Sequence, residues 1–164
     1  GHTLHYPMAE ILGYGFSTSP NIVSPSADSI LAAMRMALGK DNPIPKLTTI
    51  LPHATSTSDG DTAEAQPISA LTAEMKCPPL TVPLKALTGH ECWMSGVSTI
   101  VYAIIQQQAG FVSPHPNRTE KDSAASSLVI PTKAQDYNHD LVLCNSFGFG
   151  GTNASIYLHL FWKA

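Results

Sequence analysis

The sequence predicts an α/β fold in which helices cover a layered sheet. Short apolar runs alternate with longer stretches of helical spacing along most of the chain. The chain then ends in two apolar runs on either side of a glycine-rich segment, a pattern typical of a β-hairpin. A chain of 164 residues is long enough to bury one hydrophobic core. We therefore expect a single domain over residues 1–164.

The first third of the chain is expected to form strand, helix and strand. An apolar stretch within residues 4–16 ends in glycines and predicts a strand that runs into a loop. Polar residues at 26–28 cap a helix over about residues 29–38, and Gly39 is its expected stop. A short buried strand follows at residues 47–51.

The middle of the chain repeats the alternation. A helix is expected over about residues 62–75, where Asp61 as N-cap and Glu64 three residues later form a variant of the capping box. The next strand, at 80–84, contains Pro83 and should be an edge strand or an irregular one.

The remaining elements are a long helix, an excursion and the hairpin. The helix is expected over residues 89–108 and should be buried, because it is apolar nearly all round. A proline-rich polar excursion follows at 111–134, with 128–130 as its strand-like piece. Residues 140–145 and 154–161 are expected to pair as the hairpin.

The composition limits the possible partners and compartments. Charged residues make up only 13% of the chain, against about 25% in average globular proteins, so we expect a partner or the rest of a larger protein to cover much of the surface. A net charge of −3 argues against nucleic acid. Neither an 18-residue apolar stretch nor a signal pattern is present, so we expect no membrane insertion or export. The odd number of cysteines without zinc spacing favours a cytoplasmic location; these are Cys77, Cys92 and Cys144.

Three loops, each following an expected strand, carry the candidate chemistry. His53 is followed by Thr55 and Thr57, which would lie on one side of an extended loop. Lys85 and His90 lie five residues apart at the start of the long helix, where an N-terminus favours anions and a neutral imidazole. A lone loop histidine is usually a surface residue, but three such loops together favour a site that holds an acyl carbonyl or carboxylate.

The third loop, residues 145–153, reads Asn-Ser-Phe-Gly-Phe-Gly-Gly-Thr-Asn. Three glycines in four residues require a sharp turn and permit a close approach, while two phenylalanines hold aromatic rings nearby. On composition alone this loop could equally be a tight turn between two buried strands.

Together the three motifs resemble the C-terminal half of a β-ketoacyl-ACP synthase. Their order and separations are similar to that family over nearly the entire chain. The resemblance implies a thiolase-like half that packs against a second similar half, in a dimer or heterodimer. It also implies an acyltransferase that catalyses decarboxylative Claisen condensation of malonyl-ACP with an acyl thioester, in fatty acid or polyketide synthesis, without a metal or a nucleotide.

The resemblance also assigns roles to individual residues. His53 and His90 would donate hydrogen bonds to the malonyl thioester as it loses carbon dioxide, and Lys85 would hold the histidine network. The phosphopantetheine arm of the acyl carrier protein would bind at Thr55 and Thr57. The substrate side of the site would further include Phe147, Phe149 as a gate, Gly150, and Asn153, which would pin the glycine loop.

Departures from the family pattern leave alternatives open. The family's nucleophilic cysteine belongs to an N-terminal half that this chain does not contain, so that half or a partner ketosynthase subunit would have to supply it. Trp93, Thr99 and the alanine at position 54 replace usual residues, which motivates a second reading, that of a non-catalytic chain-length or scaffold subunit. The third reading is a hydrolase that uses Cys92 with His90; Cys77 and Cys144 are expected to be packing cysteines.

Overall fold

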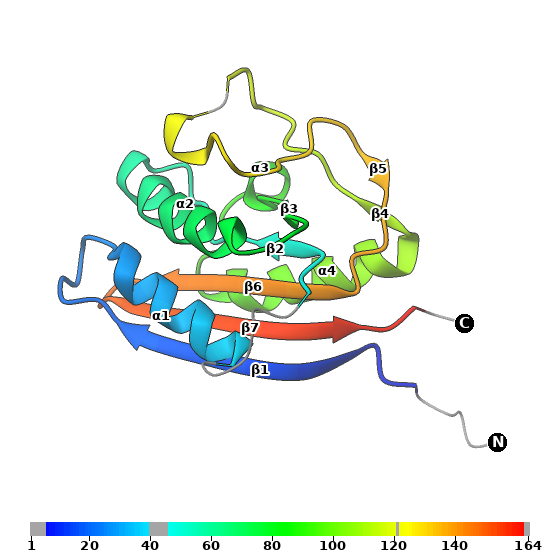
Figure 1. Ribbon diagram of the computed structural model, residues 1–164, viewed down its shortest axis with the longest axis horizontal. Helices are drawn as coiled ribbons and strands as arrows, with labels where there is room; N and C mark the ends of the chain where they lie inside the picture. Colours follow the sequence, from blue (N-terminus) through cyan, green and yellow to red (C-terminus); the bar gives the residue numbers. More distant parts are fainter. Residues whose placement is uncertain (1–5, 40–45, 121, 163–164) are drawn as a thin grey trace.

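A five-stranded mixed sheet runs through the middle of the computed structural model, which describes residues 6–39, 46–120 and 122–162 (Figure 1). The strand order is β1-β7-β6-β2-β3. The pairs β2–β3 and β2–β6 are parallel, whereas β7 runs antiparallel to both β6 and β1. The α/β prediction is confirmed. The strands are β1 (Ala9–Thr18), β2 (Thr49–Leu51), β3 (Leu80–Thr81), β6 (Leu141–Gly148) and β7 (Thr152–Leu160).

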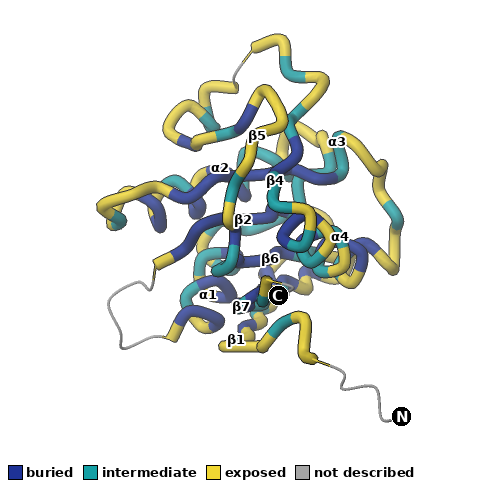
Figure 2. Tube along the Cα trace, turned by 90° about the vertical axis from the view of Figure 1, so that its right-hand side faces the viewer, coloured by how far each residue is buried: buried dark blue, intermediate teal, exposed yellow. Residues whose placement is uncertain are grey.

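Helices lie on both faces of this sheet. Figure 2 shows α1 (Ala27–Leu38) and α2 (Ser58–Ala73) on one side of the strands and α4 (Ser95–Ala109) on the other. The helix α1 begins as predicted, because the Ser26 side chain accepts a hydrogen bond from the backbone N–H of Ser29 at 3.3 Å.

Two glycines of β1 let α1 lie directly against the strand. A Cβ built on Gly13 would lie 2.1 Å from the carbonyl oxygen of Ala37, and one built on Gly15 would lie 2.1 Å from that of Ala33. No side chain fits in that space, so the strand and the helix backbone meet without an intervening layer.

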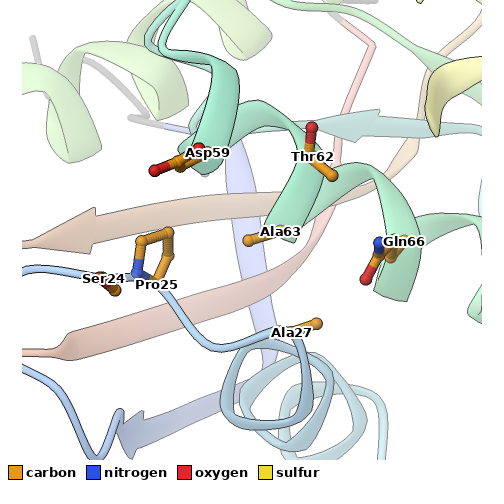
Figure 3. A pocket seen from close by; sticks show the side chains of 7 residues that line it. All are labelled: Ser24, Pro25, Ala27, Asp59, Thr62, Ala63 and Gln66. Atoms are coloured by element: carbon orange, nitrogen blue, oxygen red, sulfur yellow. The ribbon is translucent and has the colours of Figure 1, made fainter. Parts of the chain in front are cut away.

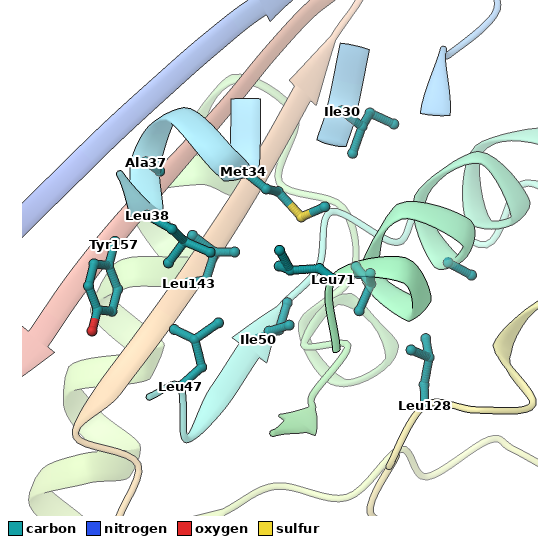
Figure 4. Close-up of a cluster of buried hydrophobic side chains, with 12 residues drawn as sticks. Ile30, Met34, Ala37, Leu38, Leu47, Ile50, Leu71, Leu128, Leu143 and Tyr157 are labelled. Carbon is teal, nitrogen blue, oxygen red and sulfur yellow. The ribbon is translucent and has the colours of Figure 1, made fainter. Parts of the chain in front are cut away.

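The core is divided between the two faces. One cluster fills the space between α1, α2 and the sheet, and Figure 4 shows its side chains converging from these elements. The second lies on the α4 side and includes buried residues of β2, β6 and β7, among them Leu51, Val142 and Leu158.

The boundary predicted for the second helix is wrong. The helix α2 begins at Ser58, four residues earlier than expected, with Thr57 in the N-cap position. Asp61 therefore lies inside the first turn, where its carboxylate accepts a hydrogen bond from the backbone N–H of Ser56 at 3.1 Å. Glu64 does not close a capping box, because its carboxylate turns toward the loop that follows β2.

The long helix also differs from its prediction. The four-residue turn α3 (Lys85–Thr88) precedes the predicted span of 89–108, the 3₁₀ turn η1 (Cys92–Met94) takes up its start, and α4 begins only at Ser95. Positive φ angles of 76° at Gly89 and 49° at Cys92 interrupt the helical path. Only part of α4 is buried, because one stripe along it, Val97, Val101 and Ile105, lies exposed.

The proline-rich excursion holds more structure than expected. It begins with β4 (Phe111–Val112), which pairs with β5 (Gln135–Asp136), and contains the 3₁₀ turn η2 (Ser123–Ala125). The strand-like piece at 128–130 contributes a single parallel bridge, Val129 to Leu80. The expectation for 80–84 is confirmed, since β3 is short and lies at the edge of the five-stranded sheet.

Three consecutive glutamines fix the C-terminal turn of α4. Gln106 accepts a hydrogen bond from the backbone N–H of Ser113 at 2.7 Å. Gln107 accepts one from the backbone N–H of His139 at 3.0 Å, and Gln108 donates to the carbonyl oxygen of Phe161 at 2.6 Å. Each side chain therefore reaches a different segment of the chain.

Candidate functional site

The topology brings the three predicted loops to one edge of the sheet. Because β2, β3 and β6 are parallel neighbours, their carboxyl ends meet at the same edge. His53 follows β2, Lys85 begins the turn after β3, and Phe147 lies near the end of β6. The site that the sequence divides among three loops is therefore contiguous in space.

The two histidine rings face each other across this edge. The ring centroids of His53 and His90 are 5.5 Å apart, with the planes nearly perpendicular at 88°. The ring of Phe147 also packs against His53, with centroids 5.3 Å apart. Both imidazoles therefore lie within reach of one small substrate group.

The protonation of both rings follows from their surroundings. The backbone N–H of Cys92 donates to Nδ1 of His90 at 3.1 Å, so this nitrogen is unprotonated and Nε2 carries the ring proton. Burial, and after it the positive charge of Lys85, lowers the pKa of His53 to about 3. His53 is therefore neutral near pH 7.

A buried carboxylate, predicted from the sequence to belong to a helix cap, holds the His53 loop. Glu64 is 2% exposed, and it accepts hydrogen bonds from the backbone N–H groups of His53 and Ala54, both at 2.8 Å. The side-chain amide of Asn145 donates to the same carboxylate at 3.0 Å, and Ser155 donates to Asn145 at 2.8 Å. Burial raises the pKa of Glu64, and these hydrogen bonds oppose the rise.

This carboxylate also holds a strained backbone. Ala54 has φ 30° and Ser56 has φ 64°, a region in which residues with a Cβ are uncommon. A signal for Glu64 exists in the sequence, since an acid within the first two turns of the helix that follows a histidine loop can reach back to the loop's amides.

Lys85 lies half-buried beside the histidines. Burial lowers the pKa of its ammonium, while the carboxylates of Glu64, Glu91 and Asp61 oppose this effect, with Glu64 the strongest. The hydroxyl oxygens of Thr55 and Thr57 lie 3.2 Å apart at the rim of the same loop. The two threonines therefore do share one side of the loop.

The glycine segment is mostly strand. Only residues 149–151 form the turn, because β6 continues to Gly148 and β7 begins at Thr152. Gly150 has φ 88°, and the Phe149 side chain stands 97% exposed beside it. The predicted hairpin is confirmed, with longer strands and a shorter turn than expected.

Hydrogen bonds tie this turn to the segment that follows β1. The buried Asn153 amide donates to the carbonyl oxygen of Gly151 at 3.2 Å and to the Ser19 hydroxyl at 3.1 Å. The backbone N–H of Gly150 donates to the carbonyl oxygen of Ile22 at 3.1 Å. Asn153 thus lies where it can hold the glycine turn in place.

The cysteines are poorly placed for nucleophilic catalysis within this chain. Burial raises the pKa of Cys144 to about 12. Cys92 is exposed, but its thiol lies 3.9 Å from the carbonyl oxygen of His90, and its own backbone N–H occupies the Nδ1 that could otherwise act as its base. Cys77 is exposed, so its expected packing role is wrong.

Two further features lie outside the histidine site. An open groove of about 400 Å³ runs between the segment before α1 and the first turns of α2, lined by Ser24, Pro25, Ala27, Asp59, Thr62, Ala63 and Gln66 (Figure 3). Within residues 6–39, 46–120 and 122–162, no three His, Cys, Asp or Glu side chains gather as metal ligands, and no helix has the length and apolar content needed to cross a membrane.

Comparisons with known proteins agree with this arrangement. Residues 8–119 match the family model described as "Beta-ketoacyl synthase, C-terminal domain". The chain is 39% identical over 150 residues to 3-oxoacyl-[acyl-carrier-protein] synthase 1 of Escherichia coli K12, a match that covers 90% of this chain and 36% of the relative. The chain thus spans little more than a third of that relative's length.

Solved structures of similar shape include ketosynthases. The ishigamide ketosynthase/chain length factor superposes with a TM-score of 0.83 at 29% identity, covering 94% of this chain and 38% of that one. A β-ketoacyl synthase from Burkholderia phymatum STM815 superposes with a TM-score of 0.79 at 27% identity, with the same shares. The expected thiolase-like half is confirmed by these matches.

Proposed function

Because this chain belongs to the β-ketoacyl synthase family, as a C-terminal domain, we propose that it supplies the decarboxylation half of a ketosynthase active site. The observation that carries the proposal is the pair of facing imidazoles, His53 and His90, 5.5 Å apart. His53 is uncharged near pH 7, and His90, whose Nδ1 accepts from the backbone N–H of Cys92, presents Nε2–H as a donor.

The proposed chemistry uses these donors on a malonyl thioester. The bond between the malonyl carboxylate carbon and the α-carbon breaks, carbon dioxide leaves, and the electron pair moves onto the thioester oxygen. Hydrogen bonds from His53 and His90 stabilise that developing enolate, as preorganised donors do for other oxyanions. The enolate carbon then attacks an acyl thioester on a cysteine, which leaves as a thiolate when the new carbon–carbon bond forms.

Lys85 and the threonines complete the proposed site. The ammonium of Lys85, beside His53, disfavours a second positive charge on that ring and so keeps it neutral. Thr55 and Thr57, at the rim, would hold the phosphopantetheine arm of an acyl carrier protein. Phe147, Phe149, Gly150 and Asn153 would form the wall beside the acyl group.

The nucleophilic cysteine is proposed to come from an N-terminal ketosynthase half, on the same polypeptide or on a partner subunit, in a cytoplasmic dimer or heterodimer. Trp93 is 99% exposed, and Val97, Val101 and Ile105 continue from it at intervals of four residues along α4. Exposed apolar stripes of this kind mark protein contacts. This stripe supports a partner half that packs over α4.

Activity of the assembled enzyme tests the proposal. The chain combined with its N-terminal half should release carbon dioxide from malonyl-ACP, and His53→Ala or His90→Ala should lower that rate by about 10²-fold or more. His159→Ala, near the opposite end of β7, is the matched control and should leave the rate unchanged. A stable, cysteine-bearing complex that releases no carbon dioxide would refute the catalytic reading.

A non-catalytic chain-length or scaffold subunit is the second candidate. The exposed Trp93 and the strained Ala54 favour it, since each lies within three residues of one of the two histidines in the sequence. In that case, condensation by the complex would be unchanged in both histidine variants, while Trp93→Gly would alter the length of the product chain.

A further inference from the structure

A row of buried polar side chains crosses the sheet beneath α1. Ser155 on β7 and Asn145 on β6 are direct cross-strand partners, and each is only 1% exposed. Glu64 of α2, which is also buried, continues the row. Polar groups withdrawn from water destabilise a fold unless they are hydrogen-bonded, so the contacts within this row decide how its members are arranged.

The hydrogen bonds of this row fix the orientation of the Asn145 amide. The Ser155 hydroxyl donates to Oδ1 of Asn145 at 2.8 Å, and Nδ2 of Asn145 donates to Oε1 of Glu64 at 3.0 Å. A carboxylate only accepts hydrogen bonds, so the NH₂ group must face Glu64 and the amide oxygen must face Ser155. The Ser155 hydroxyl therefore supplies the donor that this orientation requires.

The helix α1 covers the row. Met34 of α1 is fully buried, with its sulfur 3.4 Å from Nδ2 of Asn145. Gly15 pairs with Ser155 across the sheet, and a Cβ built on Gly15 would lie 2.1 Å from the carbonyl oxygen of Ala33. Because these side chains are almost completely withdrawn from solvent, bulk water cannot take the place of the Ser155 hydroxyl.

The row ends at the loop that carries His53. Glu64 accepts hydrogen bonds from the backbone N–H groups of His53 and Ala54, both at 2.8 Å. The strand β6 reaches the same histidine a second time, since Phe147, two residues after Asn145, packs its ring against His53. The placement of His53 thus depends on β6 through a ring contact and through a chain of hydrogen bonds.

We propose that Ser155 and Asn145 are positioning residues for His53. The Ser155 hydroxyl orients the Asn145 amide, the amide holds the Glu64 carboxylate, and the carboxylate fixes the backbone of the His53 loop. The consequence for catalysis rests on the function proposed above, whereas the ordering of the His53 loop does not.

Kinetics and hydrogen exchange of the assembled protein test the proposal. Ser155→Ala removes the hydroxyl, and it should lower kcat for carbon dioxide release by about 10-fold with little change in KM, because His53 is displaced. The backbone amides of His53 and Ala54 should exchange about 5-fold faster, measured by mass spectrometry on a peptide that contains both. Ser155→Thr restores a hydroxyl and should recover part of both losses.

Ser113→Ala is the matched control. Ser113 is buried as well, but its hydroxyl has no hydrogen-bond partner among the residues that the structure describes. The control also removes a buried serine hydroxyl, and it should give the wild-type kcat and the wild-type exchange at the His53 loop.

Asn145→Asp tests the same row independently. It keeps the shape of the side chain but turns an oxygen toward Glu64, so it should lower kcat by more than Ser155→Ala does and should release the same two amides. Exchange at His53 and Ala54 that matches the wild type in both variants would overturn the proposal, even if urea unfolded both variants more easily. An assembled wild type without activity would refute the proposed function and would leave the amide exchange to decide the positioning.

Discussion

Removal of the Glu64 carboxylate should both destabilise the fold and release the His53 loop. In Glu64→Gln, the amide keeps one oxygen acceptor and turns an NH₂ toward donors that now lack a partner. The wild-type carboxylate accepts from the backbone N–H groups of His53 and Ala54 and from the Asn145 amide. A buried donor left without an acceptor costs about 1–3 kcal/mol. Since one or two buried donors would lose their acceptor, we expect the free energy of unfolding to fall by about 2–5 kcal/mol.

Urea unfolding, followed by circular dichroism, measures this loss. Glu74→Gln is the matched control, because Glu74 lies at the other end of α2 and makes an exposed ion pair with Arg35 that should contribute no more than about 1 kcal/mol. Hydrogen exchange should at the same time show faster exchange at Ala54. Equal midpoints for the two variants would refute the assignment of Glu64 as the anchor of the loop.

Two further variants test the fold and its pH dependence. His139 is fully buried, and burial lowers its pKa to about 4 from 6.5, so the unfolded chain takes up a proton first as the pH falls. His139→Gln should therefore reduce the loss of stability between pH 7 and pH 5 by about 2 kcal/mol in urea titrations, and an unchanged pH dependence would contradict this reasoning. Gly15→Ala should lower the free energy of unfolding by at least about 2 kcal/mol, because its Cβ would overlap the Ala33 carbonyl. Gly148→Ala, which meets no atom within 4 Å, is its control, and equal destabilisation would contradict the assigned close packing.

Local patterns in the sequence predicted most of the fold. The Ser26 cap and the strand patterns at residues 47–51 and 140–145 are short-range signals, and the structure follows them. The start of α2 was misplaced because Asp61 and Glu64 match a capping box while their carboxylates serve the neighbouring loop. Such a tertiary contact overrides the local preference, and only the fold brings the two segments together.

The residues of the candidate site could be predicted from the sequence, but most of the hydrogen bonds between them could not. The motifs put His53 on one loop, Lys85 and His90 on a second and the glycine segment on a third, and parallel strands then bring those loops to one edge. The hydrogen bond to Nδ1 that sets the tautomer of His90 comes from Cys92, whose φ is positive. Cysteine has no preference for that backbone conformation, so the sequence does not predict it. The exposed stripe on α4 differs from the prediction that this helix is buried. An apolar pattern predicts burial, but it does not identify the surface that covers the stripe.

The three glutamines at the end of α4 together fix the rotation of the helix about its own axis. Gln106, Gln107 and Gln108 point about 100° apart around the axis, and each engages a separate strand or loop. A rotation or a one-residue slip of α4 would break all three contacts at once. The end far from the histidines therefore sets the angle at which the exposed stripe faces outward, so a partner meets a surface whose orientation is already determined.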